Sequence, residues 1–113
     1  MVANNQLLKA PPHQVERALK RLGADLRTAR LRRRLTLEDV SEKIGTGVRA
    51  VREAENGKPS TTVANYAALL WLYGMIDGLS DLAAPERDLE GSALAALDER
   101  QRARSKGRLD NDF

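Results

Sequence analysis

The sequence contains no cysteine, a single histidine and no long apolar run, and each absence excludes a class of protein. Without cysteine the chain forms neither a disulfide framework nor a thiolate metal site. The histidine, His13, has no evident partner for acid–base catalysis, and no group of ligand residues has metal-site spacing. No stretch of about 18 apolar residues exists to span a membrane, and the first residues lack the apolar core of a signal peptide. We therefore expect a soluble cytoplasmic protein that is no enzyme and binds no cofactor or metal.

Two glycine-containing segments lack residues that a nucleotide-binding loop requires. The Gly-Thr-Gly segment at 45–47 has neither the third glycine nor the preceding strand of a dinucleotide-binding fold. The Asn-Gly-Lys segment at 56–58 lacks the earlier glycine of a phosphate-binding P-loop, because Arg52 occupies that position. Neither segment supports an enzymatic function.

The chain of 113 residues has room for one domain with tails, and its core is large enough to fold alone. Its formal net charge of +3 is compatible with nucleic-acid binding but does not establish it. Each of its two basic clusters has two possible interpretations. It is either a solvated helix end or tail, or a surface that binds phosphates or an acidic partner. The two clusters are Arg27, Arg30, Arg32, Arg33 and Arg34, and the acid-free run of Arg100, Arg102, Arg104, Lys106 and Arg108.

Apolar residues recur at steps of three and four, which predicts helices and no strand of useful length. Tyr66 and Trp71 lie among apolar neighbours, so we expect both in the core. Beyond Pro85 large apolar residues are few, and we expect a tail that is mobile until a partner orders it, with one helix at 92–103. The predicted fold is all-α, with an N-terminal arm (1–12), a five-helix domain (13–85; helices at 13–33, 37–44, 47–55, 63–73 and 75–83) and a flexible C-terminal tail (86–113).

Residues 36–57, TLEDVSEKIGTGVRAVREAENG, have the pattern of two short helices separated by a tight turn. Thr36 is a favourable N-cap, and Asp39 three residues later completes an acidic variant of the capping box. Gly45 permits the left-handed backbone that ends a helix. This pattern predicts a helix-turn-helix motif.

The second helix of this motif has two unlike sides when residues are placed at 100° intervals. Val51 and Ala54 lie on a side that can pack against the domain. The opposite side carries an apolar group, two guanidinium groups and a carboxylate, which are the groups that read base edges and phosphates in the major groove. These residues are Val48, Arg49, Arg52 and Glu53.

The segment LGADLRTARLRRRLTLEDVSEKIGTGVRAVREAENGKPS resembles the lambda-repressor-like, or Xre/Cro-type, helix-turn-helix family, and the resemblance covers about residues 22–83. Within that family the chain looks most like the HipB-like antitoxins, in its GKPS loop, the apolar helix that follows and the basic tail. The resemblance implies a homodimer that represses its own operon and forms a complex with a HipA-like Ser/Thr kinase toxin.

Carried over position by position, the resemblance implies a role for eight residues. The base-reading face falls on Val48, Arg49 and Glu53, with Arg52 beside it; the phosphate-clamping loop falls on Asn56 and Lys58; a buried ion pair falls on Arg30 and Glu55. We expect Arg49 to donate to guanine, Val48 to touch a thymine methyl and Arg52 to reach phosphate. For Glu53 two roles stay open, accepting from cytosine or holding Arg49 in place.

The chain departs from the family at the start of each helix of the motif, of which the second is the recognition helix. Gly47 stands where a Ser or Thr usually caps this helix, and Leu37 stands where many members have a phosphate-contacting Gln. We therefore expect fewer backbone contacts to DNA than in those members.

We accordingly expect a sequence-specific, homodimeric repressor that binds an inverted-repeat operator in double-stranded DNA, within the nucleoid of the cytoplasm. Its favoured role is antitoxin and autorepressor of a HipBA-like toxin–antitoxin operon. One alternative is a free-standing phage-type or metabolic Xre-family regulator without a toxin. Another is a purely protein-binding helical module, which salt-dependent binding to duplex DNA would distinguish.

Overall fold

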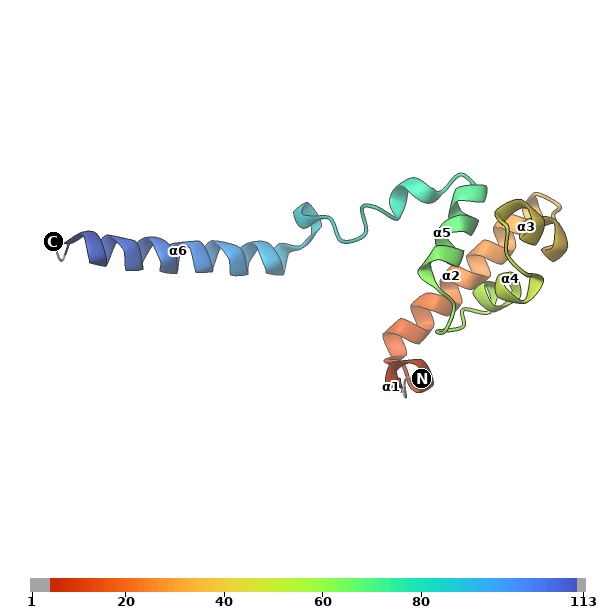
Figure 1. The fold of residues 1–113 in the computed structure, drawn as a ribbon, viewed down its shortest axis with the longest axis horizontal. Helices are drawn as coiled ribbons and strands as arrows, with labels where there is room; N and C mark the ends of the chain where they lie inside the picture. Colours follow the sequence, from red (N-terminus) through yellow and green to blue (C-terminus); the bar gives the residue numbers. More distant parts are fainter. Residues whose placement is uncertain (1–4, 112–113) are drawn as a thin grey trace. The chain divides into compact units, whose positions relative to one another are not determined.

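The protein is all-α throughout the part that the structure, a computed structural model, describes: residues 5–111, with side chains to 107 (Figure 1). Residues 1–4 of the expected arm and 112–113 of the expected tail lie outside this range. The helices are α1 (Gln6–Lys9), α2 (His13–Arg32), α3 (Leu37–Ile44), α4 (Val48–Glu55), α5 (Val63–Leu72) and α6 (Leu89–Asn111), with two short 3-10 helices, η1 (Ile76–Gly78) and η2 (Pro85–Arg87). The all-α prediction is confirmed.

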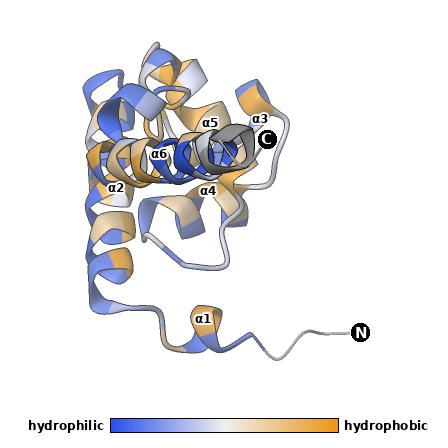
Figure 2. Ribbon diagram, turned by 90° about the vertical axis from the view of Figure 1, so that its left-hand side faces the viewer, coloured by the Kyte–Doolittle hydropathy of each residue, from blue (hydrophilic) through white to orange (hydrophobic). Residues whose placement is uncertain are grey.

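The chain divides into two units, residues 1–77 and 78–113, which are described separately. In the first, α4 packs against α2, α3 and α5, and α3 also packs against α5. Along α2, hydrophilic and hydrophobic residues alternate (Figure 2), because only one side of this helix faces the core.

The core of the first unit is small and draws on all four of these helices. Its fully buried side chains are Leu26 of α2, Val40 of α3, Val51 and Ala54 of α4, and Leu69 of α5, none more than 1% exposed. Burying a Leu or Val side chain stabilises a fold by about 1.5–3 kcal/mol. The buried face of α4 therefore fixes this helix against α2, α3 and α5 and leaves its other face outward.

Two glycines let α2 and the end of α4 approach backbone to backbone. A Cβ atom on Gly23 would lie 2.5 Å from the Ala54 carbonyl oxygen and 2.8 Å from the Gly57 amide nitrogen. A Cβ atom on Gly57, whose φ is +66°, would lie 2.6 Å from the Leu19 carbonyl oxygen. The crossing of α2 and α4 therefore accepts no side chain at either position.

The aromatic residues of α5 do not share one environment. Tyr66 is buried, as expected, and Tyr73 just after the helix is buried as well. Trp71 is 63% exposed, so its expected place in the core is wrong. The buried positions Tyr66, Leu69 and Tyr73 follow three- and four-residue steps, and Trp71 falls between them on another side of the helix.

The predicted helix at 75–83 is reduced to the single 3-10 turn η1. Gly74, with φ of +74°, ends α5, and a second glycine, Gly78, follows within the segment. Ile76 and Leu79 are only half-buried and Leu82 is 69% exposed, so little packing stabilises a longer helix here.

The C-terminal helix is longer than the predicted span of 92–103. The Asp88 carboxylate accepts a hydrogen bond from the Gly91 amide (2.9 Å), and α6 begins at Leu89. Arg, Gln, Ala and Lys then continue the helix, and all are good helix formers. Nearly every described side chain of α6 is exposed, including Leu94 and Leu97.

The N-terminal arm contains one helical turn, α1. The Asn5 side chain caps it by accepting from the Leu7 amide (3.0 Å). Its apolar residues (Figure 2) include Leu7 and Leu8, which are 52% and 45% exposed. The arm is thus locally ordered before Pro11 and Pro12.

Candidate nucleic-acid interface

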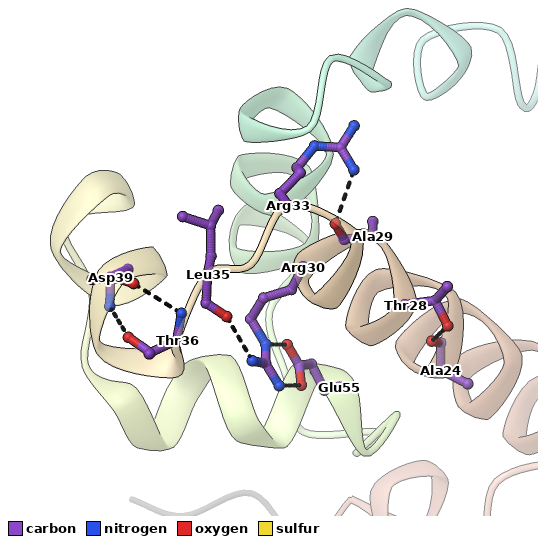
Figure 3. A network of polar contacts seen from close by, with 9 residues as sticks. All are labelled: Ala24, Thr28, Ala29, Arg30, Arg33, Leu35, Thr36, Asp39 and Glu55. Carbon is purple, nitrogen blue, oxygen red and sulfur yellow. Dashed lines mark hydrogen bonds and ion pairs between the residues drawn. The ribbon is translucent and has the colours of Figure 1, made fainter.

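The helix preceding the turn is closed by side-chain caps at its start and a left-handed residue at its end. The Thr36 hydroxyl accepts from the Asp39 amide (3.0 Å), and the Asp39 carboxylate accepts from the Thr36 amide (2.9 Å) (Figure 3). The hydrogen bond from the Thr36 amide holds the pKa of Asp39 below its ordinary value. Gly45 adopts φ of +74°, and its amide donates to the Ser41 carbonyl (3.0 Å). The chain therefore leaves α3 in a fixed direction, and α4 begins at Val48, three residues after Gly45.

The start of α4 has no side-chain cap. Gly47 occupies the N-cap position with an ordinary φ of −84°, and a Cβ atom there would meet nothing within 4 Å. The first amides of α4 are therefore left to water or to an acidic ligand, and a phosphate oxygen suits such a helix start.

The two sides of α4 differ as their sequence predicts. Val51, Ala54 and Glu55 are buried against the domain. Arg49, whose side chain is 86% exposed, and Arg52 point to solvent. Beside them Val48 and Glu53 are half-buried, and in the following loop Asn56 and Lys58 are exposed. Of these six predicted residues, the structure brings Arg49, Glu53 and Lys58 into direct contact.

Glu53 links the exposed cations of this face. Its Oε1 atom accepts from Arg49 Nε (3.1 Å) and from Lys58 Nζ (3.2 Å). Both bonds lower the pKa of Glu53, and the bond from Lys58 has the larger effect. The carboxylate therefore stays charged at neutral pH. This geometry corresponds to the holding role of Glu53, and a contact from Glu53 to cytosine stays a prediction.

A buried ion pair ties the end of α4 to α2. Arg30 donates from Nε to Glu55 Oε2 (2.6 Å) and from an amino group to Glu55 Oε1 (3.0 Å), and its other amino group donates to the Leu35 carbonyl (2.9 Å) (Figure 3). The two side chains are only 10% and 5% exposed. The bonds to Glu55 raise the pKa of Arg30 above its ordinary value. Arg30, which lies in α2, is therefore bonded both to α4, through Glu55, and to the segment that precedes α3, through Leu35.

Arg33, from the first basic cluster, is exposed but contacts the end of α5. It donates to the Ala29 carbonyl (2.9 Å) and the Tyr73 carbonyl (3.1 Å), and its guanidinium lies 5.1 Å from the centroid of the Tyr73 ring. These contacts close the end of α2 onto the end of α5, so Arg33 acts in packing.

Sequence reasoning missed a groove beside the loop that contains Asn56 and Lys58. This hollow of about 420 Å³ lies between the arm and the loop, and Leu8, Pro11, Lys20, Asn56 and Lys58 are among its lining residues. The Pro11–Pro12 pair, which is not helical, precedes α2 and is the sequence signal for the change of direction between the arm and this helix. The arm thus adds its own side chains next to Asn56 and Lys58.

Two other kinds of site are absent from the described residues. No group of three or more His, Cys, Asp or Glu side chains in residues 5–107 is placed to hold a metal ion. None of the helices in the described part has the length and apolarity to cross a membrane.

Comparison with known proteins places the motif in a family. No curated protein and no solved structure matches the chain. A family model described as a helix-turn-helix domain matches residues 21–83, more than half of the chain, from the middle of α2 to beyond η1. This range contains the capped α3, the Gly45 turn and α4 with its solvent-facing arginines. The chain therefore belongs to the helix-turn-helix family, as an Xre-like member of this group of DNA-binding transcription regulators.

Proposed function

We propose that the domain is a sequence-specific repressor that reads double-stranded DNA with α4 in the major groove. The observation that carries the proposal is the division of α4: its inner side is fixed by the core and the Arg30–Glu55 pair, and its outer side presents Arg49 at 86% exposure. A helix held in this way places its outer side chains at a defined angle to the bases. Specific readout requires such a fixed angle.

Each outer residue has a contact that suits its chemistry. Arg49 donates through its two terminal amino groups to guanine O6 and N7, since its Nε atom is engaged by Glu53. Val48 packs on a thymine methyl group. Arg52, Asn56 and Lys58 bind phosphates and set the register of α4 along the groove.

The protein acts as a homodimer on an inverted repeat, with recognition helices about 34 Å apart, one turn of B-DNA. Its favoured role is antitoxin and autorepressor, partnered by a HipA-like kinase toxin. The resemblance to HipB-like antitoxins supports this role, and so does α6, whose exposed Arg100, Arg102 and Arg104 offer a basic helix to an acidic surface. A free-standing Xre-family regulator without a toxin is the alternative.

The test is a titration of the wild-type protein on an operator selected from a random duplex library. Arg49→Ala should weaken binding to this operator by about 1–3 kcal/mol and relax the preference at one base pair. Lys58→Ala should weaken binding to every duplex alike and reduce the slope of affinity against salt by about 1.

Arg21→Ala is the matched control, because Arg21 is exposed and lies on the side of α2 away from the buried Gly23 and Leu26. It should leave binding unchanged. Equal losses on specific and scrambled duplexes for Arg49→Ala would refute its base-reading role. Absence of salt-dependent binding to any duplex would favour the protein-binding module instead.

A further inference from the structure

Helix α5 carries no charged residue on any side, although the domain covers only one of its sides. Its ten residues, VANYAALLWL, include no charged residue in a chain of which 31% of residues are charged. A helix of this kind is normally buried all round. Here Tyr66 and Leu69 fill the core, while Val63 and Trp71 are 69% and 63% exposed.

The exposed face of α5 has a symmetrical arrangement of large and small residues. Ala64 and Ala67 lie between Val63 and Trp71, and each of these two large residues is four positions from Ala67. Residues at i and i+4 lie on one side of a helix, so Val63, Ala67 and Trp71 form one stripe about 12 Å long. A stripe with a small residue at its centre fits a second copy of itself.

We propose that this face binds the α5 helix of a second copy in antiparallel orientation, with Ala67 at the two-fold axis. Trp71 of each copy then packs over Val63 of the other, and the alanines allow the two helix axes to approach to about 8 Å. No charge has to be desolvated on either side. The inference rests on the homodimer of the proposed function and identifies its interface.

The size of the surface predicts a weak, reversible association. Trp71 supplies most of it, since an aromatic side chain contributes about 150–250 Å² and 63% of this one is exposed. Two such faces bury less than the roughly 1,200 Å² at which stable interfaces begin. The dimer should therefore dissociate on dilution and reassemble when an operator holds two copies side by side.

Disulfide trapping tests the orientation, because the natural chain contains no cysteine. Ala67→Cys should be trapped as a covalent dimer on mild oxidation, since the two thiols meet at the axis. Val63→Cys should not, because the two Val63 positions lie on opposite ends of the contact. Ala18→Cys, on an exposed alanine of α2, is the control and should stay monomeric. Failure of Ala67→Cys to cross-link, or efficient cross-linking of Val63→Cys, would overturn the proposed packing.

Fluorescence and sedimentation test the interface in the unmodified protein. Trp71 is the single tryptophan of the chain, so its emission should shift to the red as the protein is diluted and the dimer separates. Trp71→Ala should raise the dimer dissociation constant about 30-fold or more. Leu82→Ala, which removes an equally exposed apolar side chain elsewhere, should change it less than twofold. A dissociation constant that Trp71→Ala leaves unaltered, or a wild type that is monomeric at all concentrations, would overturn the proposal.

A DNA titration separates failure of this inference from failure of the proposed function. Trp71→Ala should bind a duplex with one half-site as well as wild type does and lose affinity only for the full inverted repeat. If wild type dimerises through Ala67 but binds no duplex, the interface stands and the repressor function falls. If Trp71→Ala retains full affinity for the inverted repeat, α5 is not the interface.

Discussion

The Arg30–Glu55 pair predicts a large and specific loss of stability when one partner is removed. Both side chains are at most 10% exposed, and three hydrogen bonds satisfy the guanidinium group. Glu55→Ala would leave a buried cation without its counter-charge, which costs about 3–5 kcal/mol. Domains of this size unfold with a free energy of about 5–15 kcal/mol, so the variant should lose at least about a fifth of its stability.

Two further variants make the prediction sharper. Arg30→Met should lose a similar amount, since it leaves a buried carboxylate and also deprives the Leu35 carbonyl of its donor. The double variant Arg30→Met with Glu55→Leu removes both charges at similar volume, and it should recover most of the loss of either single variant.

Urea unfolding followed by circular dichroism measures these free energies. The matched control is Lys20→Ala, which breaks a salt bridge of similar length, Lys20 Nζ to Glu16 Oε1 at 3.0 Å, whose side chains are 64% and 43% exposed. Its loss should stay below about 1 kcal/mol. Equal losses for the buried and the exposed pair, or additive effects in the double variant, would refute the reasoning from burial.

Two other predictions concern the glycines and the α3 cap. Gly23→Ala should destabilise the fold by several kcal/mol in urea unfolding, because its Cβ atom would lie 2.5 Å from the Ala54 carbonyl oxygen. Gly47→Ser, at a position with open space, should stabilise the fold by a few tenths of a kcal/mol. Similar effects of the two variants would contradict the crossing geometry. The lowered pKa of Asp39 contributes stability above the ordinary pKa of 3.8, and this contribution is lost as the pH falls through the lowered value. Asp39→Asn should therefore unfold with a shallower pH dependence in this acid range, and an unchanged dependence would show that the cap does not couple to folding.

Local sequence signals predicted the motif because its cause is local. The Thr36–Asp39 box and the left-handed Gly45 depend on residues within one or two turns, and both have the expected geometry. The inward side of α4 follows from helix periodicity alone. The structure also places Arg30 beside Glu55, a contact 25 residues apart in sequence that only the family resemblance had indicated.

The structure differs from the sequence predictions at positions whose conformation depends on tertiary packing. Trp71 is a large apolar residue among apolar neighbours, as core residues are. It is nevertheless exposed, because the neighbouring helices decide which side of α5 faces the core. The apolar pattern at 75–83 does not form a helix because little of it is covered. Helix α6 is longer than its few large apolar residues predict, because good helix formers continue the helix without them. The mobility of the tail and the domain boundary at residue 85 stay predictions.

The close crossing of α2 and α4 at Gly23 and Gly57 has a consequence for how the DNA preference of the proposed repressor could change. Backbone atoms at Gly23, Ala54 and Gly57 set the pose of α4, and its outer side chains take no part in that contact. Under the proposed function, substitutions at Val48 or Arg49 would therefore change which bases are preferred without altering the angle at which α4 enters the groove. Binding preference and scaffold geometry are separable, so a library randomised at these two positions should yield folded proteins that differ in the DNA they select.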